Sequence, residues 1–177
     1  MVPNRMMVFQ SSVRLLGILM VLGLVGTLPH QARADHIKQK EYLWIKVVKG
    51  DMEEVLATIR AVAGSKNFPV SNVRNYGETF PKRLKEVGDR RSFDYSAYMI
   101  IEACNVMLAI DALELDPLMG AFMPCRLFFF SRKNSPDITV VTINPYFMPH
   151  VLNRPDLEPV AKRVAKVMTE IFQELDF

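Results

Sequence analysis

Residues 126–144 read RLFFFSRKNSPDITVVTIN. The segments 126–131 and 137–144 are rich in aromatic and β-branched residues, which favour strands. Between them, residues 133–136 read KNSP, a run of residues that favour turns. The stretch therefore predicts a β-hairpin, and the rest of the domain must be built around it.

Upstream and downstream of the hairpin, strands and helices alternate. Further strands are predicted at 42–49, 67–78 and 96–104, and helices at 52–64, 82–87, 106–115 and from Asp156 onward. Residues 145–155, rich in proline and aromatic residues, are expected to form a loop. This order predicts an α+β domain with a mostly antiparallel sheet and helices packed on one face.

Local signals mark the helix ends. Asp51 is predicted to cap the first helix, with Glu54 completing a capping box and Gly64 at its C-terminus. Asn105 and Asp156 are predicted to cap the helices that follow them.

Several strands are apolar on both sides. Phe128 and Phe130 alternate with Leu127 and Phe129, and the strand at 42–49 shows the same pattern. An antiparallel sheet with one solvated face should instead alternate apolar with polar residues. The second face is therefore expected to meet another molecule, with a second subunit as the first alternative and an apolar ligand as the next.

The helix at 106–115 is also apolar on nearly every side. Such a helix is either deeply buried or part of an interface.

The first 34 residues have the composition of a secretory signal peptide. Arg5 and Arg14 give a basic start, residues 15–28 carry no charge, and Ala32-Arg33-Ala34 fits a cleavage site. The uncharged run of 14 residues is shorter than the roughly 20 that span a bilayer. We expect cleavage after Ala34, a lead-in at 35–41, one domain at 42–177 and a periplasmic or otherwise exported protein with no membrane span.

Cleavage would also change the charge. Three of the 22 basic residues lie before residue 35, which leaves 19 basic against 19 acidic residues. A chain with no net charge and no basic run is not expected to bind nucleic acid.

Three motifs follow one another between residues 102 and 126: Glu102-Ala103-Cys104-Asn105, Asp116-Pro117-Leu118-Met119-Gly120 and Met123-Pro124-Cys125-Arg126. In this order they resemble the bacterial domain-of-unknown-function family 302, although Val106 stands where that family often has proline. The resemblance covers about residues 42–145. It implies a compact α+β domain of the TATA-binding-protein-like kind, often dimeric, with no defined activity. It also implies a loose association with exported redox or sulfur systems.

Cys104 and Cys125 are the only cysteines, one at the end of a predicted strand and one just before another. In an exported protein such a pair is a disulfide candidate, provided that the two strands are neighbours. Two buried thiols, a redox-active pair and a soft-metal site are the alternatives. The positive end of the helix after Asn105 is expected to lower the pKa of Cys104.

Glu102 and Arg126 flank the two cysteines and are expected to form an ion pair across the same strand junction, with a structural role. Met148 and His150, together with Met119 and Met123, suggest a soft-metal patch of the copper type. His36, second in the cleaved chain, is a weaker candidate. No other cofactor is indicated.

Motifs for haem attachment, zinc binding, nucleophilic serine and phosphate binding are absent from the sequence. No catalytic residue is therefore predicted. The sequence favours a non-enzymatic, exported and dimeric accessory domain over a thiol-redox or metal-handling protein, and over a carrier of a small apolar ligand.

Overall fold

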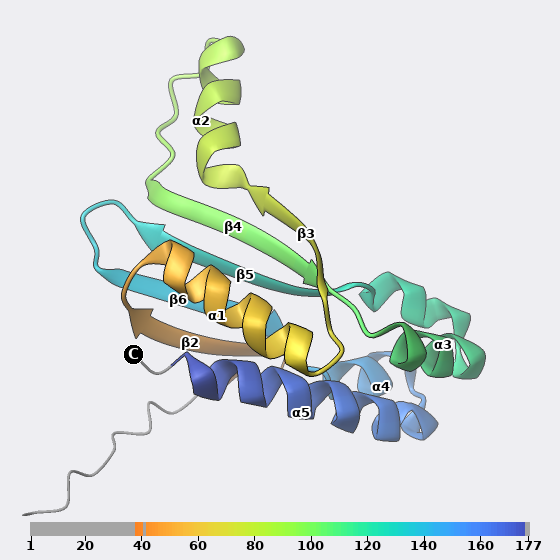
Figure 1. Ribbon diagram of the computed structural model, residues 1–177. Coiled ribbons are helices and arrows are strands. Elements are labelled where there is room, and N and C mark those ends of the chain that lie inside the picture. Colours follow the sequence, from red (N-terminus) through yellow and green to blue (C-terminus); the bar gives the residue numbers. More distant parts are fainter. Residues whose placement is uncertain (1–37, 41, 176–177) are drawn as a thin grey trace, which may run out of the picture. The chain divides into compact units, whose positions relative to one another are not determined.

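A computed structural model describes residues 38–40 and 42–175 of the chain (Figure 1). In this part, six antiparallel strands form one sheet in the order β1-β2-β6-β5-β4-β3. The strands are β1 (Lys38–Lys40), β2 (Leu43–Lys49), β3 (Val70–Asn75), β4 (Tyr95–Ala103), β5 (Cys125–Arg132) and β6 (Asp137–Ile143). The predicted signal peptide lies outside the described residues, and β1 lies within the predicted lead-in.

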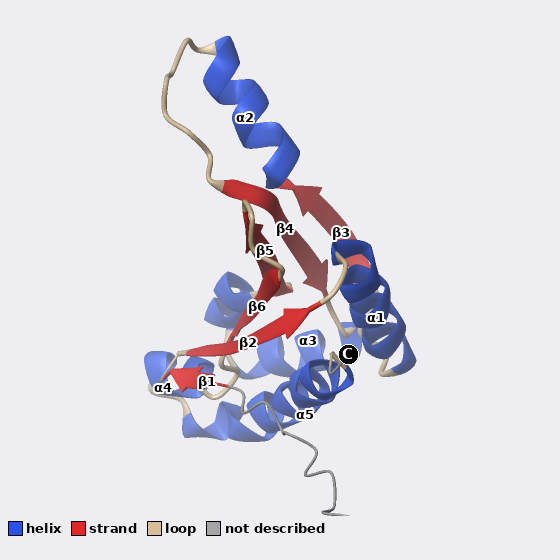
Figure 2. Cartoon of the chain, turned by 90° about the vertical axis from the view of Figure 1, so that its left-hand side faces the viewer, coloured by secondary structure: helices blue, strands red, loops and turns tan. Residues whose placement is uncertain are grey.

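The helices are α1 (Met52–Ser65), α2 (Tyr76–Glu86), α3 (Val106–Leu115), α4 (Phe147–Leu152) and α5 (Glu158–Glu174), with 3-10 turns η1 (Pro117–Phe122) and η2 (Pro155–Leu157). Two of them, α1 and α5, lie side by side on one face of the sheet (Figures 1 and 2). The predicted α+β class, with its antiparallel sheet and helices on one face, is confirmed.

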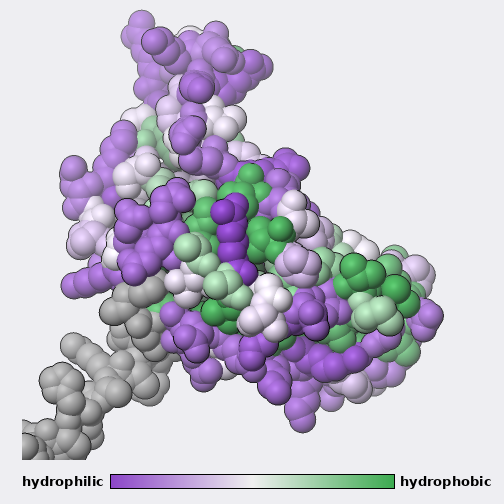
Figure 3. All heavy atoms as spheres, viewed as in Figure 1, coloured by the Kyte–Doolittle hydropathy of each residue, from purple (hydrophilic) through white to green (hydrophobic). Residues whose placement is uncertain are grey.

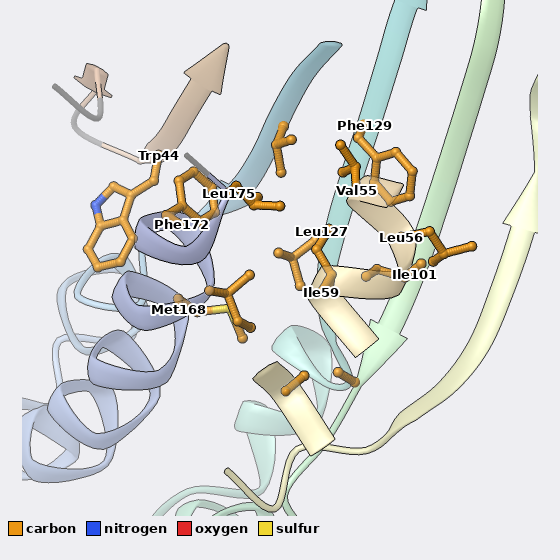
Figure 4. Packing of buried hydrophobic residues seen from close by; sticks show 14 of the residues in the cluster. Trp44, Val55, Leu56, Ile59, Ile101, Leu127, Phe129, Met168, Phe172 and Leu175 are labelled. Carbon is orange, nitrogen blue, oxygen red and sulfur yellow. The ribbon is translucent and has the colours of Figure 1, made fainter. Parts of the chain in front are cut away.

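The core lies between this helix pair and the sheet (Figure 4). Phe129 and Leu127 of β5 are completely buried, as are Ile59 of α1 and Ile171 of α5. Burying each such side chain contributes about 1.5–3 kcal/mol relative to leaving it exposed. The predicted hairpin thus supplies the centre of the core, because β5 and β6 are the middle strands of the sheet.

Lys46 is an unusual member of the core-facing side of β2. It is 4 % exposed, and its Nζ donates a hydrogen bond of 2.6 Å to the Phe172 carbonyl in the last turn of α5. The carbonyls at a helix C-terminus have no partner within the helix and carry partial negative charge, so they suit a buried ammonium. Side chains of a strand alternate between the two faces of the sheet. In β2, Trp44, Lys46 and Val48 point toward the core, and Leu43, Ile45 and Val47 point to the opposite face.

The ends of α1 differ in part from prediction. Asp51 caps the helix, but its carboxylate accepts a hydrogen bond from the Glu53 amide at 2.8 Å. Gly64 lies inside the last turn, and Asn67 takes the left-handed conformation at φ 59° that ends the helix. The amide of Phe68 then bonds the Ala63 carbonyl at 2.8 Å, which completes a C-terminal capping motif in which asparagine replaces glycine.

The end of the strand predicted at 67–78 and the start of the helix predicted at 82–87 were both placed too late in the chain. The strand ends at Asn75, whose side chain caps α2, so the helix begins at Tyr76. A side chain at Gly77 would place its Cβ 2.9 Å from the Tyr98 amide nitrogen, so only glycine fits where α2 leaves the sheet.

Two predictions near the C-terminus were also wrong. The expected loop at 145–155 contains α4, a helix too short to show a periodic pattern. Asp156 does not cap α5, because its carboxylate accepts two hydrogen bonds, of 2.9 and 2.6 Å, from the Arg154 guanidinium.

Candidate functional site

The two cysteines meet at the junction between β4 and β5. These strands are neighbours, and their register places Ala103 opposite Cys125 and Glu102 opposite Arg126. Cys104 directly follows β4, and Cys125 opens β5. The neighbouring strands that a disulfide would require are therefore present. Both cysteines carry free thiols in this structure, and the disulfide itself stays a prediction.

Burial controls the chemistry of both thiols. It raises the pKa of Cys104, and it raises the pKa of Cys125 to about 11, with a further contribution from the nearby Cys104. The expected lowering of the Cys104 pKa at the helix end is therefore wrong, because loss of solvent outweighs any favourable effect of α3. At neutral pH both thiols are protonated, and a protonated thiol is a poor nucleophile.

Two small cavities lie at this junction. The first has a volume of about 40 Å³, and its lining includes Arg126 and Thr142. The second has a volume of about 30 Å³, and its lining includes Asn105 and Leu108. They share the side chains of Phe122, Cys125, Met148 and Val164.

The second cavity is rich in sulfur. Its lining includes Cys104, Cys125, Met119, Met123 and Met148. Met119 and Met148 are buried, while Met123 and both cysteines are half-buried. From the sequence, the cysteines and the methionines were separate candidate sites. In the structure all five residues line the same cavity.

His150 does not belong to this group. It lies in α4 two residues after Met148, but it is exposed and lies outside the lining of both cavities. In the part of the chain that the structure describes, there is no group of three or more His, Cys, Asp or Glu side chains placed to hold a metal ion.

The predicted ion pair between Glu102 and Arg126 is confirmed, with Nε to Oε1 at 3.2 Å. Asn72 of β3 donates a second hydrogen bond to Glu102 at 3.1 Å. The Asn72 amide, followed by the Arg126 guanidinium, lowers the pKa of Glu102. The carboxylate is thus ionised at neutral pH and already has partners, an arrangement that suits fixing the strand register.

Asn105 caps α3, as predicted. Its Oδ1 accepts a hydrogen bond from the Leu108 amide at 2.9 Å, and its side chain also lines the second cavity. Its first role is therefore to start the helix directly after Cys104, which fixes the direction in which the chain leaves β4.

The second candidate region is the open face, the side of β2, β6, β5 and β4 that points away from α1 and α5. Phe128 and Phe130 of β5 lie on it beside Tyr98 of β4, with ring centroids 5.9–6.3 Å apart and nearly parallel planes. Other apolar members are Ile45, Val47, Ile100, Val141 and Ile143. The apolar second face that the sequence predicted is therefore present.

More aromatic rings extend the open face toward α2. The ring of Tyr95 packs edge-on against those of Tyr98 and Phe130, with ring centroids 5.5 Å apart in both pairs. The ring of Phe93 in turn packs against both Tyr95 and Phe80 of α2. Sequence reasoning missed this extension, since Phe80 and Phe93 lie in or near segments with polar patterns. Their spacing along the chain gave no signal that they would meet.

Helix α3 carries a separate hydrophobic patch. Val106 and Met107 are each 67 % exposed, and Leu118 of η1 is 64 % exposed. Hydrophobic surface is visible over α3 at the right of Figure 3. Of the two alternatives predicted for this helix, deep burial does not occur within the chain, and an interface stays a prediction.

Comparison with known proteins agrees with this architecture. The family model described as "Domain of unknown function DUF302" matches residues 44–175, which include both candidate regions. The chain belongs to the DUF302 family. The crystal structure of an uncharacterized conserved DUF302 protein from Bacillus stearothermophilus is similar, with 20 % sequence identity and a TM-score of 0.65. The match covers 77 % of this chain and 99 % of that one.

Membership of DUF302 confirms the resemblance seen in the motifs at 102–126 and assigns no activity. At 20 % identity the solved structure shows a shared fold alone. The curated proteins contain no match to the chain. Within residues 38–40 and 42–175, none of the helices of this DUF302 protein is long and apolar enough to cross a membrane.

Proposed function

We propose that this DUF302 protein is an exported, non-enzymatic accessory domain that forms a homodimer through its open face. The observation that carries the proposal is the aromatic centre of that face, formed by Phe128, Phe130 and Tyr98. A contiguous apolar surface of this kind is typical of a protein interaction site.

The charges around the open face support a protein partner. The Glu102–Arg126 pair lies at one end of it, and Arg132, which pairs with Asp94 at 3.7 Å, lies near the other. Aromatic residues at the centre and charged residues at the rim are the usual arrangement in interfaces.

A second copy of the chain is the partner that fits best. The rim carries both acidic and basic residues, and a two-fold interface places each residue opposite a copy of the same surface. Residues 35–177 carry 19 basic and 19 acidic side chains, so net charge does not oppose pairing.

The chemistry of the polar groups supports a non-enzymatic role. Cys104 and Cys125 have raised pKa values, which disfavours nucleophilic attack at neutral pH. Glu102 has a lowered pKa, which disfavours a role as a general acid. The basic, apolar and A-x-A pattern of residues 1–34 supports export to the periplasm or another exported location.

Sedimentation velocity of the purified protein tests the dimer. The proposal expects a dimer that Phe128→Asp converts to a monomer with unchanged far-ultraviolet circular dichroism. Met107→Asp places the same charge on the exposed patch of α3 and serves as the matched control, because the dimer should persist.

Three results would count against the proposal: a wild-type monomer at every concentration, a dimer that survives Phe128→Asp, or a dimer lost only in Met107→Asp. A monomer that carries a small apolar molecule, released by Phe128→Asp, would instead support the ligand-carrier alternative on the same face.

A further inference from the structure

The sulfur-lined cavity is too small for an organic ligand. Its volume is about 30 Å³, whereas pockets for drug-sized molecules measure about 300–1,000 Å³. It has room for one metal ion or a few atoms. Water is poorly suited to it, since a buried water needs two to four polar partners, and Asn105 is the main polar side chain in the lining.

The donor set of the cavity selects the ion. Thiolate and thioether sulfurs are soft ligands that favour Cu(I), whereas zinc sites use Cys, His, Asp or Glu. Three of the five sulfur side chains belong to methionine, and no zinc-type cluster occurs among the described residues.

The positions of the sulfurs suit capture from solution. Met119 and Met148 are buried, while Cys104, Cys125 and Met123 are half-buried and keep part of their surface in contact with solvent. Cys104 also lies directly before the N-terminus of α3, whose partial positive charge would stabilise a negatively charged dithiolate complex.

We propose that Cys104 and Cys125, together with Met123 and Met148, bind a single Cu(I) ion in this cavity. Each cysteine that binds replaces its S–H bond with an S–Cu bond and releases the proton to solvent, and copper stays in the +1 state throughout. The site goes beyond the proposed dimer and does not use the open face.

Anaerobic titration tests the site. The full chain, purified and reduced, is titrated with Cu(I) in competition with a chromogenic Cu(I) chelator of known affinity. We expect one Cu(I) per chain and X-ray absorption that shows sulfur neighbours alone. Replacing both cysteines, by Cys104→Ser with Cys125→Ser, should weaken binding by at least about 100-fold, and Met148→Leu by about tenfold, judged against the 10–100-fold effects of supporting residues.

The controls separate ligands from neighbours. Met107→Leu, on the exposed side of α3, and His150→Ala should bind Cu(I) like wild type, and Phe128→Asp should bind it as a monomer. Met123→Leu gives a second test should the double cysteine variant fail to fold, and it should weaken binding by about tenfold. Absence of 1:1 binding, nitrogen neighbours in the absorption spectrum, or wild-type affinity in the double cysteine variant would overturn the proposal.

Discussion

Phe128 and Phe129 are adjacent in β5 but point to opposite faces of the sheet, so truncating each should have different consequences. Phe129 is 0 % exposed and packs in the core, with Met99 and Val140 as its cross-strand neighbours. Phe128 is half-buried on the open face, between Ile100 and Val141.

The magnitudes follow from these surroundings. Phe129→Ala removes a fully buried ring and should lower the free energy of unfolding by about 3–5 kcal/mol. The milder Phe129→Leu should lower it by about 1 kcal/mol. Phe128→Ala removes ring contacts at a half-exposed position, so in the monomer it should lower the free energy of unfolding by about 1 kcal/mol. If the wild type is a dimer, association stabilises its folded chain more at higher protein concentration. The loss of stability caused by Phe128→Ala should therefore grow with protein concentration.

Urea unfolding followed by circular dichroism, at a low and a high protein concentration, measures both effects. The urea midpoint of the wild type should rise with protein concentration. Phe129→Leu should lower that midpoint by the same amount at both concentrations, and Phe128→Ala should remove its dependence on concentration. The reasoning would be refuted by a wild-type midpoint that is independent of concentration, or by a dilute Phe128→Ala protein as unstable as Phe129→Ala.

Three further predictions concern the strand junction. In the metal-free protein the pKa of Cys125 rises from an ordinary 9.0 to about 11, so about 3 kcal/mol of stability present below pH 9 should be lost as pH rises through 11. Cys125→Ala should remove this contribution in unfolding titrations and leave the part of the slope that comes from Cys104, whose pKa is also raised. Glu102 has a lowered pKa, so the stability it adds should be lost below about pH 4.5, and Glu102→Gln should remove about 0.2–1 kcal/mol at pH 7 and flatten the acid limb. Asn105→Ala should cost about 1 kcal/mol by thermal unfolding, whereas Asn105→Asp, which keeps the capping oxygen, should cost less.

The parts of the fold with strong local signals were predicted from the sequence. The hairpin of β5 and β6 and the Asn105-capped α3 were placed correctly because turn and capping residues adjoin clear apolar runs. The start of α2 was missed because Asn75 suits both a strand end and a cap. The helix α4 was missed because its six residues complete fewer than two turns.

The candidate site was predicted only where it depends on local order. Neighbouring strands bring Cys104 beside Cys125 and pair Glu102 with Arg126, and both relations follow from residues at strand ends. The approach of Met119 and Met148 to the cysteines depends on how η1 and α4 pack, which no sequence spacing encodes. The direction of the Cys104 pKa shift was wrong for the same reason, since burial is a tertiary property.

Photo-crosslinking from the open face tests the central claim most directly. Phe130→p-benzoylphenylalanine places the reactive group among the aromatic rings of β4 and β5. Irradiation of the purified protein, followed by mass spectrometry of the peptides, should join two copies of the chain through residues of β4, β5 and β6. Crosslinks confined to a single chain, or between chains through α3, would contradict a dimer formed by the open face.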